Sequence, residues 1–189
     1  MEPRTLQLKD GRSVLIRSAK PGDGQRTYDF MYALGASTDL MLTHPGDMRT
    51  AEQYEENITK IADGAFYSVC AIDPETETII GNAAFFFGVR VKVSHVAGLA
   101  MGVLPDWQGI GLGAWLLERA IEDMRLHPKI HRLDLLVMEG NDHARAMYER
   151  AGFVNEGYRQ GAVRQPSGVF RGEYMMGMAV GDFVMTEKK

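Results

Sequence analysis

The stretch Val103-Leu-Pro-Asp-Trp-Gln-Gly-Ile-Gly-Leu-Gly-Ala114 decides the fold, because it joins a predicted strand directly to the strongest helical pattern in the chain. Gly109, Gly111 and Gly113 allow the backbone to approach a ligand closely and to adopt conformations that a Cβ atom disfavours. The first N–H groups of the following helix lack a partner within the helix, and the helix dipole is positive at that end. The stretch therefore predicts an anion site that suits a pyrophosphate group, with Gln108 as a further neutral donor.

Two familiar phosphate-binding motifs do not fit this stretch. The dinucleotide fingerprint G-x-G-x-x-G needs a third glycine, but Ala114, Trp115 and Leu116 follow Gly113. The P-loop needs a lysine and then a hydroxyl residue after its last glycine, where this chain has Ala114 and Trp115. A glycine-rich connection that serves only tight packing stays open as the alternative.

The flanking segments predict a mixed α/β fold as a single domain over residues 1–189, because strands and helices follow one another without a linker or a repeat. Thr50 and Gln53 have the spacing of a capping box, and Asn141 is a good N-cap. Strands are predicted at 5–8, 13–17, 66–73, 78–90, 93–103, 132–138, 153–159 and 169–180, and helices after Pro21, after Thr50, at 112–126 and after Asn141. In the helix after Pro21, the apolar set that follows helical spacing is Tyr28, Met31, Tyr32 and Gly35.

A second constellation lies about 30 residues beyond the glycine stretch, after the next predicted strand. It reads Asn141-x-x-Ala144 and then Tyr148-x-x-x-Gly152-Phe153. Together with Gln108-x-x-Gly111-x-Gly113, it resembles the GNAT superfamily of acetyl-CoA-dependent N-acyltransferases, and Pro105 matches the proline common before the family's glycine loop. The matching region covers about residues 99–157. The segment after it looks like the ending of bacterial N-acetyltransferases that act on amino acids, small amines or protein N-termini.

The resemblance implies a central, mostly antiparallel, splayed sheet of six to seven strands flanked by about four helices. It implies acetyl-CoA as cosubstrate, with no metal, and direct attack by an amine in a ternary complex. An extended amide-bearing ligand can pair with an open strand edge, as peptides do. The implied cofactor-binding residues are Met101 and Val103 through their backbone, the N–H groups of Gln108, Gly109, Ile110, Gly111, Leu112, Gly113 and Ala114, and also Asn141 and Tyr148.

Tyr148 matches the family position that protonates the departing CoA thiolate, a role open to a phenol in a dry site. A packing role is the alternative, because Tyr148 shares an apolar helix face with Ala144, Met147 and Ala151. No general base is secured by the sequence. His95 is the first candidate because histidine titrates in the right range, and Glu139, Asp134 or a water chain stay open.

Composition limits the remaining function classes. The chain has 189 residues, 45% hydrophobic residues, 24% charged residues and a net charge of −4, which excludes wholesale disorder and disfavours a nucleic-acid-binding role. The single Cys70 excludes an internal disulfide, suits a reducing compartment and is expected to be a small buried side chain. The chain also shows no basic-plus-apolar leader at its start and no apolar run long enough to span a membrane, so we expect a cytoplasmic protein.

These observations predict an N-acetyltransferase that uses a small-molecule amine or a peptide N-terminus as acceptor. The acidic balance gives a slight preference for a cationic acceptor. A non-catalytic acyl-CoA-binding or sensing module is the alternative from another class. A protein acetyltransferase that docks a flexible N-terminus through residues 39–48 is a further one, and the apolar C-terminal strands favour a homodimer.

Overall fold

The computed structural model describes residues 2–61 and 66–182, and its elements alternate as the sequence predicts. The strands are β1 (Arg4–Gln7), β2 (Ser13–Ser18), β3 (Phe66–Ile72), β4 (Ile79–Phe87), β5 (Val96–Val103), β6 (Arg132–Met138), β7 (Val154–Arg164) and β8 (Phe170–Ala179). The helices are α1 (Gly24–Ser37), α2 (Ala51–Thr59), α3 (Leu112–Arg125) and α4 (Asp142–Ala151), with short 3₁₀ turns η1 (Pro45–Asp47), η2 (Val91–Val93) and η3 (Pro105–Trp107). The end expected for the second helix at Gly64 lies outside the described residues.

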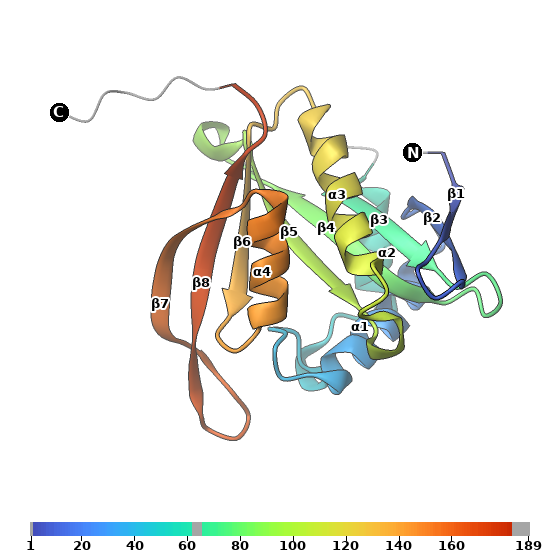
Figure 1. Cartoon of the computed structure of the whole chain (residues 1–189), viewed down its shortest axis with the longest axis horizontal. Helices are drawn as coiled ribbons and strands as arrows, with labels where there is room; N and C mark the ends of the chain where they lie inside the picture. Colours follow the sequence, from blue (N-terminus) through green and yellow to red (C-terminus); the bar gives the residue numbers. More distant parts are fainter. Residues whose placement is uncertain (1, 62–65, 183–189) are drawn as a thin grey trace.

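One mixed sheet organises these elements. Within the described residues it has eight strands in the order β1-β2-β3-β4-β5-β6-β8-β7, one more than the upper end of the range expected from the resemblance. Every neighbouring pair is antiparallel except β5 and β6, which run parallel. Helices α3 and α4 cover one face of the sheet, and α1 and α2 cover the opposite face (Figure 1). The fold is therefore the mostly antiparallel sheet with four helices that the sequence predicts.

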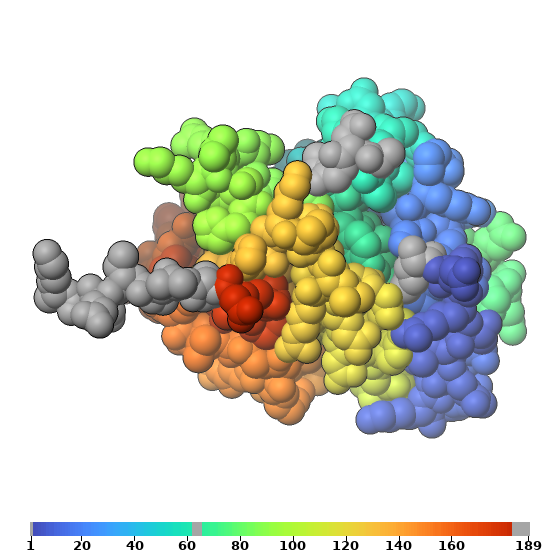
Figure 2. Space-filling view, turned by 90° about the horizontal axis from the view of Figure 1, so that it is seen from above, coloured from blue at the N-terminus to red at the C-terminus, as the bar shows by residue number. Residues whose placement is uncertain are grey.

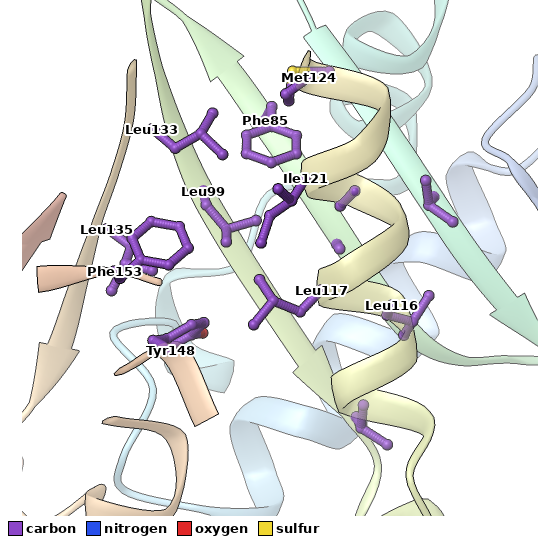
Figure 3. Close-up of a cluster of buried hydrophobic side chains, with 14 of the residues drawn as sticks. Phe85, Leu99, Leu116, Leu117, Ile121, Met124, Leu133, Leu135, Tyr148 and Phe153 are labelled. Atoms are coloured by element: carbon purple, nitrogen blue, oxygen red, sulfur yellow. The ribbon is translucent and has the colours of Figure 1, made fainter. Parts of the chain in front are cut away.

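The larger hydrophobic cluster lies between the sheet and α3. Helix α3 buries Leu116, Leu117, Ile121 and Met124, which recur at helical spacing along one side. Figure 3 shows Leu117 and Ile121 directed toward Leu99, and Met124 beside Phe85, whereas Leu116 points the other way, where it lies against Gly81. Burying a side chain of this size stabilises the fold by roughly 1.5–3 kcal/mol, so this face fixes where α3 begins and where the glycine stretch lies.

A smaller cluster lies on the other face, beneath α1 and α2, and includes Phe30, Leu34, Ile58 and Cys70. Cys70 is fully buried, as expected, and burial raises the pKa of its thiol. The apolar set in the sequence of α1 is not its buried face. Phe30 and Leu34 point into the sheet, whereas Tyr32 is 48% exposed. A tyrosine can expose its hydroxyl end to water, so helical spacing alone does not show whether Tyr32 is buried.

The local helix signals are confirmed. The Thr50 hydroxyl accepts a hydrogen bond from Gln53 N, and the Gln53 side chain accepts one from Thr50 N, which completes the capping box of α2. Asn141 Oδ1 accepts from Ala144 N at 3.3 Å and caps α4. Figure 2 shows α3 on the surface beside the β1–β2 hairpin and, on its other side, α4. Across residues 2–61 and 66–182, none of the helices combines the length and the apolar character needed to cross a bilayer.

Candidate active site

The two central parallel strands separate along their length. Strand β5 pairs with β6 from Val96 opposite Arg132 to Gly98 opposite Asp134, and the two strands diverge beyond that point (Figure 1). The edge of β5 that faces β6 is therefore open from Leu99 onward. An open strand edge presents unpaired N–H and C=O groups to an extended ligand.

The backbone hydrogen bonds between β5 and β4 show which residues of β5 face this gap. Gly88 N donates to Val96 O at 3.1 Å, and Leu104 N donates to Ile80 O at 2.9 Å. Since alternate residues of an antiparallel pair exchange hydrogen bonds, the even-numbered residues of β5 direct their backbone groups toward β4. The odd-numbered residues Met101 and Val103 then direct theirs toward the gap, as the resemblance implies for pairing with the cosubstrate.

The glycine stretch follows this edge and adopts conformations that require glycine. Gly109 and Gly111 have φ of +75° and +93°, which L side chains rarely adopt. Helix α3 begins without a side-chain cap. Within the described part of the chain, the N–H groups of Gly109 through Ala114 donate no hydrogen bond. This row of free donors at the positive end of a helix fits a pyrophosphate group.

Gln108 acts differently from the expectation. Its backbone N–H donates to Pro105 O at 3.1 Å, and its side-chain Nε2 donates to Val103 O at 2.8 Å. The residue therefore holds the loop against the end of β5, and the row of free donors begins at Gly109. The side-chain donor expected for the anion is already used within the protein.

The β1–β2 turn brings cationic residues to the glycine loop, which the sequence analysis missed. The Lys9 side chain lies along Gly111, since a Cβ there would meet Lys9 Cε at 3.4 Å. Arg12 donates to Asp106 O at 2.8 Å and stacks on Trp107, 4.0 Å from the ring centre. Lys9 has no ion-pair partner within the described residues. These contacts join residues about 100 positions apart, so no local sequence signal could have shown them.

Tyr148 lies at the base of the gap. Its side chain is 8% exposed and packs edge-on against Phe153, with 5.8 Å between the ring centres. Figure 3 shows its ring between Phe153 and Leu117 of α3. Burial raises the pKa of the phenol above its usual value, so the hydroxyl stays protonated at neutral pH. The packing role is real, and the position also suits a proton donor to the gap.

The structure does not bring His95 to this gap. His95 is exposed just before β5, six residues from Met101, which corresponds to about 20 Å along a strand. Asp134 forms an ion pair with Arg132 at 2.7 Å. Glu139 accepts a hydrogen bond from Gly172 N at 2.9 Å, and this bond lowers the pKa of its carboxyl. Each candidate base is therefore distant or already engaged in a structural contact.

Two cavities open on the face of the sheet that α1 and α2 cover. The first has a volume of about 540 Å³ and lies between residues 38–47 and the β7–β8 turn, with Asp39, Asp47 and His44 in its wall. The second has a volume of about 100 Å³ and reaches Met101 of β5 and Asn82 of β4. The side chain of Met41 lines both cavities. Sequence reasoning missed Asn82 because the cavity forms only when three strands pair in register.

An open strand edge that leads into a glycine-rich anion site defines a protein that binds an extended ligand with an anionic end. Comparison with known proteins gives the particular class. The model of the acetyltransferase (GNAT) family matches residues 36–153, so this chain belongs to the GNAT family. The description of this family as acetyltransferases supports an acyl-CoA cosubstrate.

Individual relatives agree with the family assignment. A mycothiol acetyltransferase from Beutenbergia cavernae is 36% identical over 77 residues, which are 39% of this chain and 26% of that protein. The chain thus spans about a quarter of the length of this curated relative. An acetyltransferase of the GNAT family from Streptococcus pneumoniae has a TM-score of 0.83 and 28% identity, covering 88% of this chain and 99% of that one.

A more distant relative shares the fold. It is the spermidine N-acetyltransferase from Vibrio cholerae, solved in complex with CoA and spermine. Its TM-score is 0.71 at 20% identity, with 88% of this chain and 95% of that chain covered.

Proposed function

We propose that this protein transfers the acetyl group of acetyl-CoA to a primary amine by direct attack in a ternary complex. The observation that carries this proposal is the continuity between the open edge of β5 and the free N–H groups of Gly109 through Ala114. An extended amide chain with a pyrophosphate at one end needs both features in that order. The family assignment favours an enzyme over the non-catalytic acyl-CoA-binding alternative.

Backbone groups do the binding and the orienting. The N–H groups from Gly109 to Ala114 hold the pyrophosphate, with Lys9 adding positive charge beside Gly111. Backbone groups of Met101 and the N–H of Val103 hold the pantetheine chain, since Val103 O already accepts a hydrogen bond from Gln108. Acetyl-CoA supplies the activated acetyl thioester. The Met101 N–H is aimed at the gap, where it stabilises negative charge on the thioester oxygen during attack, a contribution that is large in a dry site.

Proton transfers complete the reaction. The Tyr148 hydroxyl donates its proton to the departing thiolate sulfur, and the attacking nitrogen, which carries one proton too many once the C–N bond has formed, returns a proton to the phenolate. The acceptor ammonium must first lose a proton. Since His95, Asp134 and Glu139 are distant or engaged in other contacts, we propose that this proton leaves through water to bulk solvent.

A CoA-release assay tests the proposal with a panel of amino acids, polyamines and N-terminal peptides. Tyr148→Phe should lower kcat by about 100-fold or more, the usual contribution of a general acid. Its affinity for acetyl-CoA, measured by calorimetry, should stay close to that of the wild type. Tyr32→Phe is the matched control, because Tyr32 is 48% exposed on α1 and outside the gap.

Two results would contradict the proposal. Failure of the wild type to bind acetyl-CoA would remove its basis. Full activity of Tyr148→Phe would show that the tyrosine serves only packing and that the thiolate leaves unassisted.

A homodimer and a cytoplasmic location complete the proposal. Leu136 and Met175 lie opposite each other on β6 and β8 and are 46% and 36% exposed, which gives this part of the sheet an apolar surface. Such a surface supports self-association. Light scattering at micromolar concentration measures the oligomeric state, and a mass of one chain would exclude the dimer.

A further inference from the structure

We propose that the cavity beside Met101 binds the acceptor, and that the acceptor is a small α-amino acid with an apolar side chain. The inference rests on the proposed function, since it concerns the amine that attacks the acetyl group. The proposed acceptor carries a carboxylate beside its amine. It therefore differs from the cationic acceptor that the net charge of the chain slightly favours. Four observations carry it.

The register of the central strands creates the space. Residues directly opposite each other in antiparallel strands point to the same face, so Asn82 shares a face with Gly102, and Ala84 shares it with Ala100. Strand β5 has only a hydrogen or a methyl group at these positions. Ala100 is exposed although it lies in the middle of an eight-stranded sheet. The Leu34 side chain occupies the space beside Gly102, whereas the methyl group of Ala100 leaves room for a cavity of about 100 Å³ next to the strand edge that receives the thioester.

The wall of this cavity is mainly apolar. Its apolar surface comes from α1, α2 and the strands β3 to β5, including Phe30, Met31, Leu34, Phe66 and Phe86. Phe66 and Phe86 pack against each other at one end with tilted rings, 5.2 Å between the ring centres. A cavity with this lining binds an aliphatic or aromatic group and offers few hydrogen-bond partners to a hydrated polar group.

Asn82 supplies an oriented acceptor for the amine. Its Nδ2 donates to Ser68 Oγ at 2.6 Å and lies 3.3 Å from Val69 O. Since a carbonyl oxygen only accepts hydrogen bonds, the group facing Val69 must be the NH₂ group, which fixes the orientation of the amide. Within the described residues, Asn82 Oδ1 has no partner. It can accept a hydrogen bond from the amine without the charge that would hold the amine as ammonium.

Arg49 supplies the cation that recognises the carboxylate. Among the described residues that line this cavity, it is the only one with a charged side chain, and none is Asp or Glu. Arg49 is exposed, and no carboxylate pairs with it in residues 2–61 and 66–182. It precedes α2, whose start is fixed by the Thr50 capping box. A guanidinium in this position can form two hydrogen bonds with a carboxylate.

The larger neighbouring cavity does not replace this one. Its carboxylates Asp39 and Asp47 could attract a cation, but its wall contains no residue of β4 or β5. A polyamine bound there would keep its charge away from Met101. The attacking nitrogen must lie beside β5, where Arg49 is the one charged side chain among the described residues of the cavity wall.

The test compares leucine with leucinamide and spermidine in the CoA-release assay at saturating acetyl-CoA. Leucine should have a kcat/KM about 10- to 100-fold above that of leucinamide, the range expected for a charge-assisted hydrogen bond. The amide has a less basic amine and so more of the reactive neutral form. A higher kcat/KM for leucine therefore cannot result from a larger fraction of neutral, reactive amine.

Variants of Arg49 and Asn82, with Lys60→Gln as a control, show which side chains bind the amino acid. Arg49→Gln should raise KM for leucine by about 10-fold or more and leave the values for leucinamide unchanged. Lys60→Gln removes the same charge at the opposite end of α2, outside the cavity wall, and should leave the preference intact. Asn82→Leu should lower kcat for both amines, and Asn82→Asp should lower it as well, because a carboxylate would hold the amine as ammonium and could not donate to Val69 O. Calorimetry with acetyl-CoA verifies that each variant still folds and binds the cosubstrate.

The outcomes separate the two proposals. Equal or better use of spermidine or leucinamide, unchanged preference in Arg49→Gln, turnover of peptide N-termini alone, or acetyl-CoA binding with no amino acid turned over would each overturn the acceptor inference. The proposed acetyl-CoA site would survive all four results. Failure to bind acetyl-CoA would overturn both.

Discussion

Replacing Gly111 by alanine tests whether the backbone of the glycine loop, and not its side chains, holds the cosubstrate. Gly111 has φ of +93°, a conformation that costs an L residue about 1–2 kcal/mol. The added Cβ would lie 3.4 Å from the flexible end of Lys9, so crowding adds little. Gly111→Ala should therefore destabilise the fold by about 1–2 kcal/mol unless the loop rotates to relieve the strain.

Rotation of the loop has a separate effect on binding. It would turn the N–H groups of Gly111 and Leu112 away from their common direction. A hydrogen bond to a charged group contributes about 1.5–3 kcal/mol, so losing one such bond should weaken acetyl-CoA binding by about 10- to 100-fold. Gly22→Ala is the matched control, because Gly22 has φ of +94°, open space around its Cα and a position remote from this loop.

Thermal unfolding and calorimetric titration with acetyl-CoA measure the two effects. Both variants should lose about 2–8 °C in Tm, the shift that corresponds to 1–2 kcal/mol in a chain of this length. Only Gly111→Ala should lose affinity. The reasoning is refuted if Gly111→Ala binds acetyl-CoA like the wild type, or if Gly22→Ala loses as much affinity.

Three further perturbations address single contacts. Thr50→Ala removes the hydroxyl that accepts from Gln53 N and should lower the free energy of unfolding in urea by about 1 kcal/mol, whereas Thr50→Ser should not. Lys9→Ala should weaken acetyl-CoA binding and reduce its salt dependence, and an unchanged salt slope would exclude a phosphate contact. Burial raises the pKa of Asp23, but hydrogen bonds from Arg17 and Lys20 N outweigh it and lower the pKa below its usual value. Asp23 therefore stabilises the fold above about pH 4, and this stability should fall as the pH drops further. Acid unfolding that is identical in Asp23→Asn would contradict this.

Features that depend on near neighbours in the chain were predictable from the sequence. The Thr50–Gln53 capping box, the Asn141 cap and the buried face of α3 each involve residues three or four positions apart. Such contacts form in one helical turn, so the local pattern specifies them. The glycine stretch belongs to the same group, because the positive φ of Gly111 is a local property.

Features that depend on strand register were not predictable. Asn82 and Gly102 are 20 positions apart and meet only because β4 pairs with β5 in one register. His95 lies away from the gap for the opposite reason. It precedes the correct strand, but that strand is long enough to place it about 20 Å from Met101. The distance from His95 to the open edge of β5 can be stated only when the structure shows where β5 separates from β6.

Strand β5 serves both substrates through its two-residue alternation. Its odd-numbered residues Met101 and Val103 turn their backbone groups toward the gap and their side chains toward the core beneath α3. Its even-numbered residues Ala100 and Gly102 turn their small or absent side chains toward the acceptor cavity. A bulky residue at an even position would fill the cavity without touching the cosubstrate edge, and a one-residue slip of the strand would exchange the two functions. Ala100 is therefore explained by the need to bring one substrate to the edge of β5 and the other to its face, and Gly102 by the close approach of Leu34.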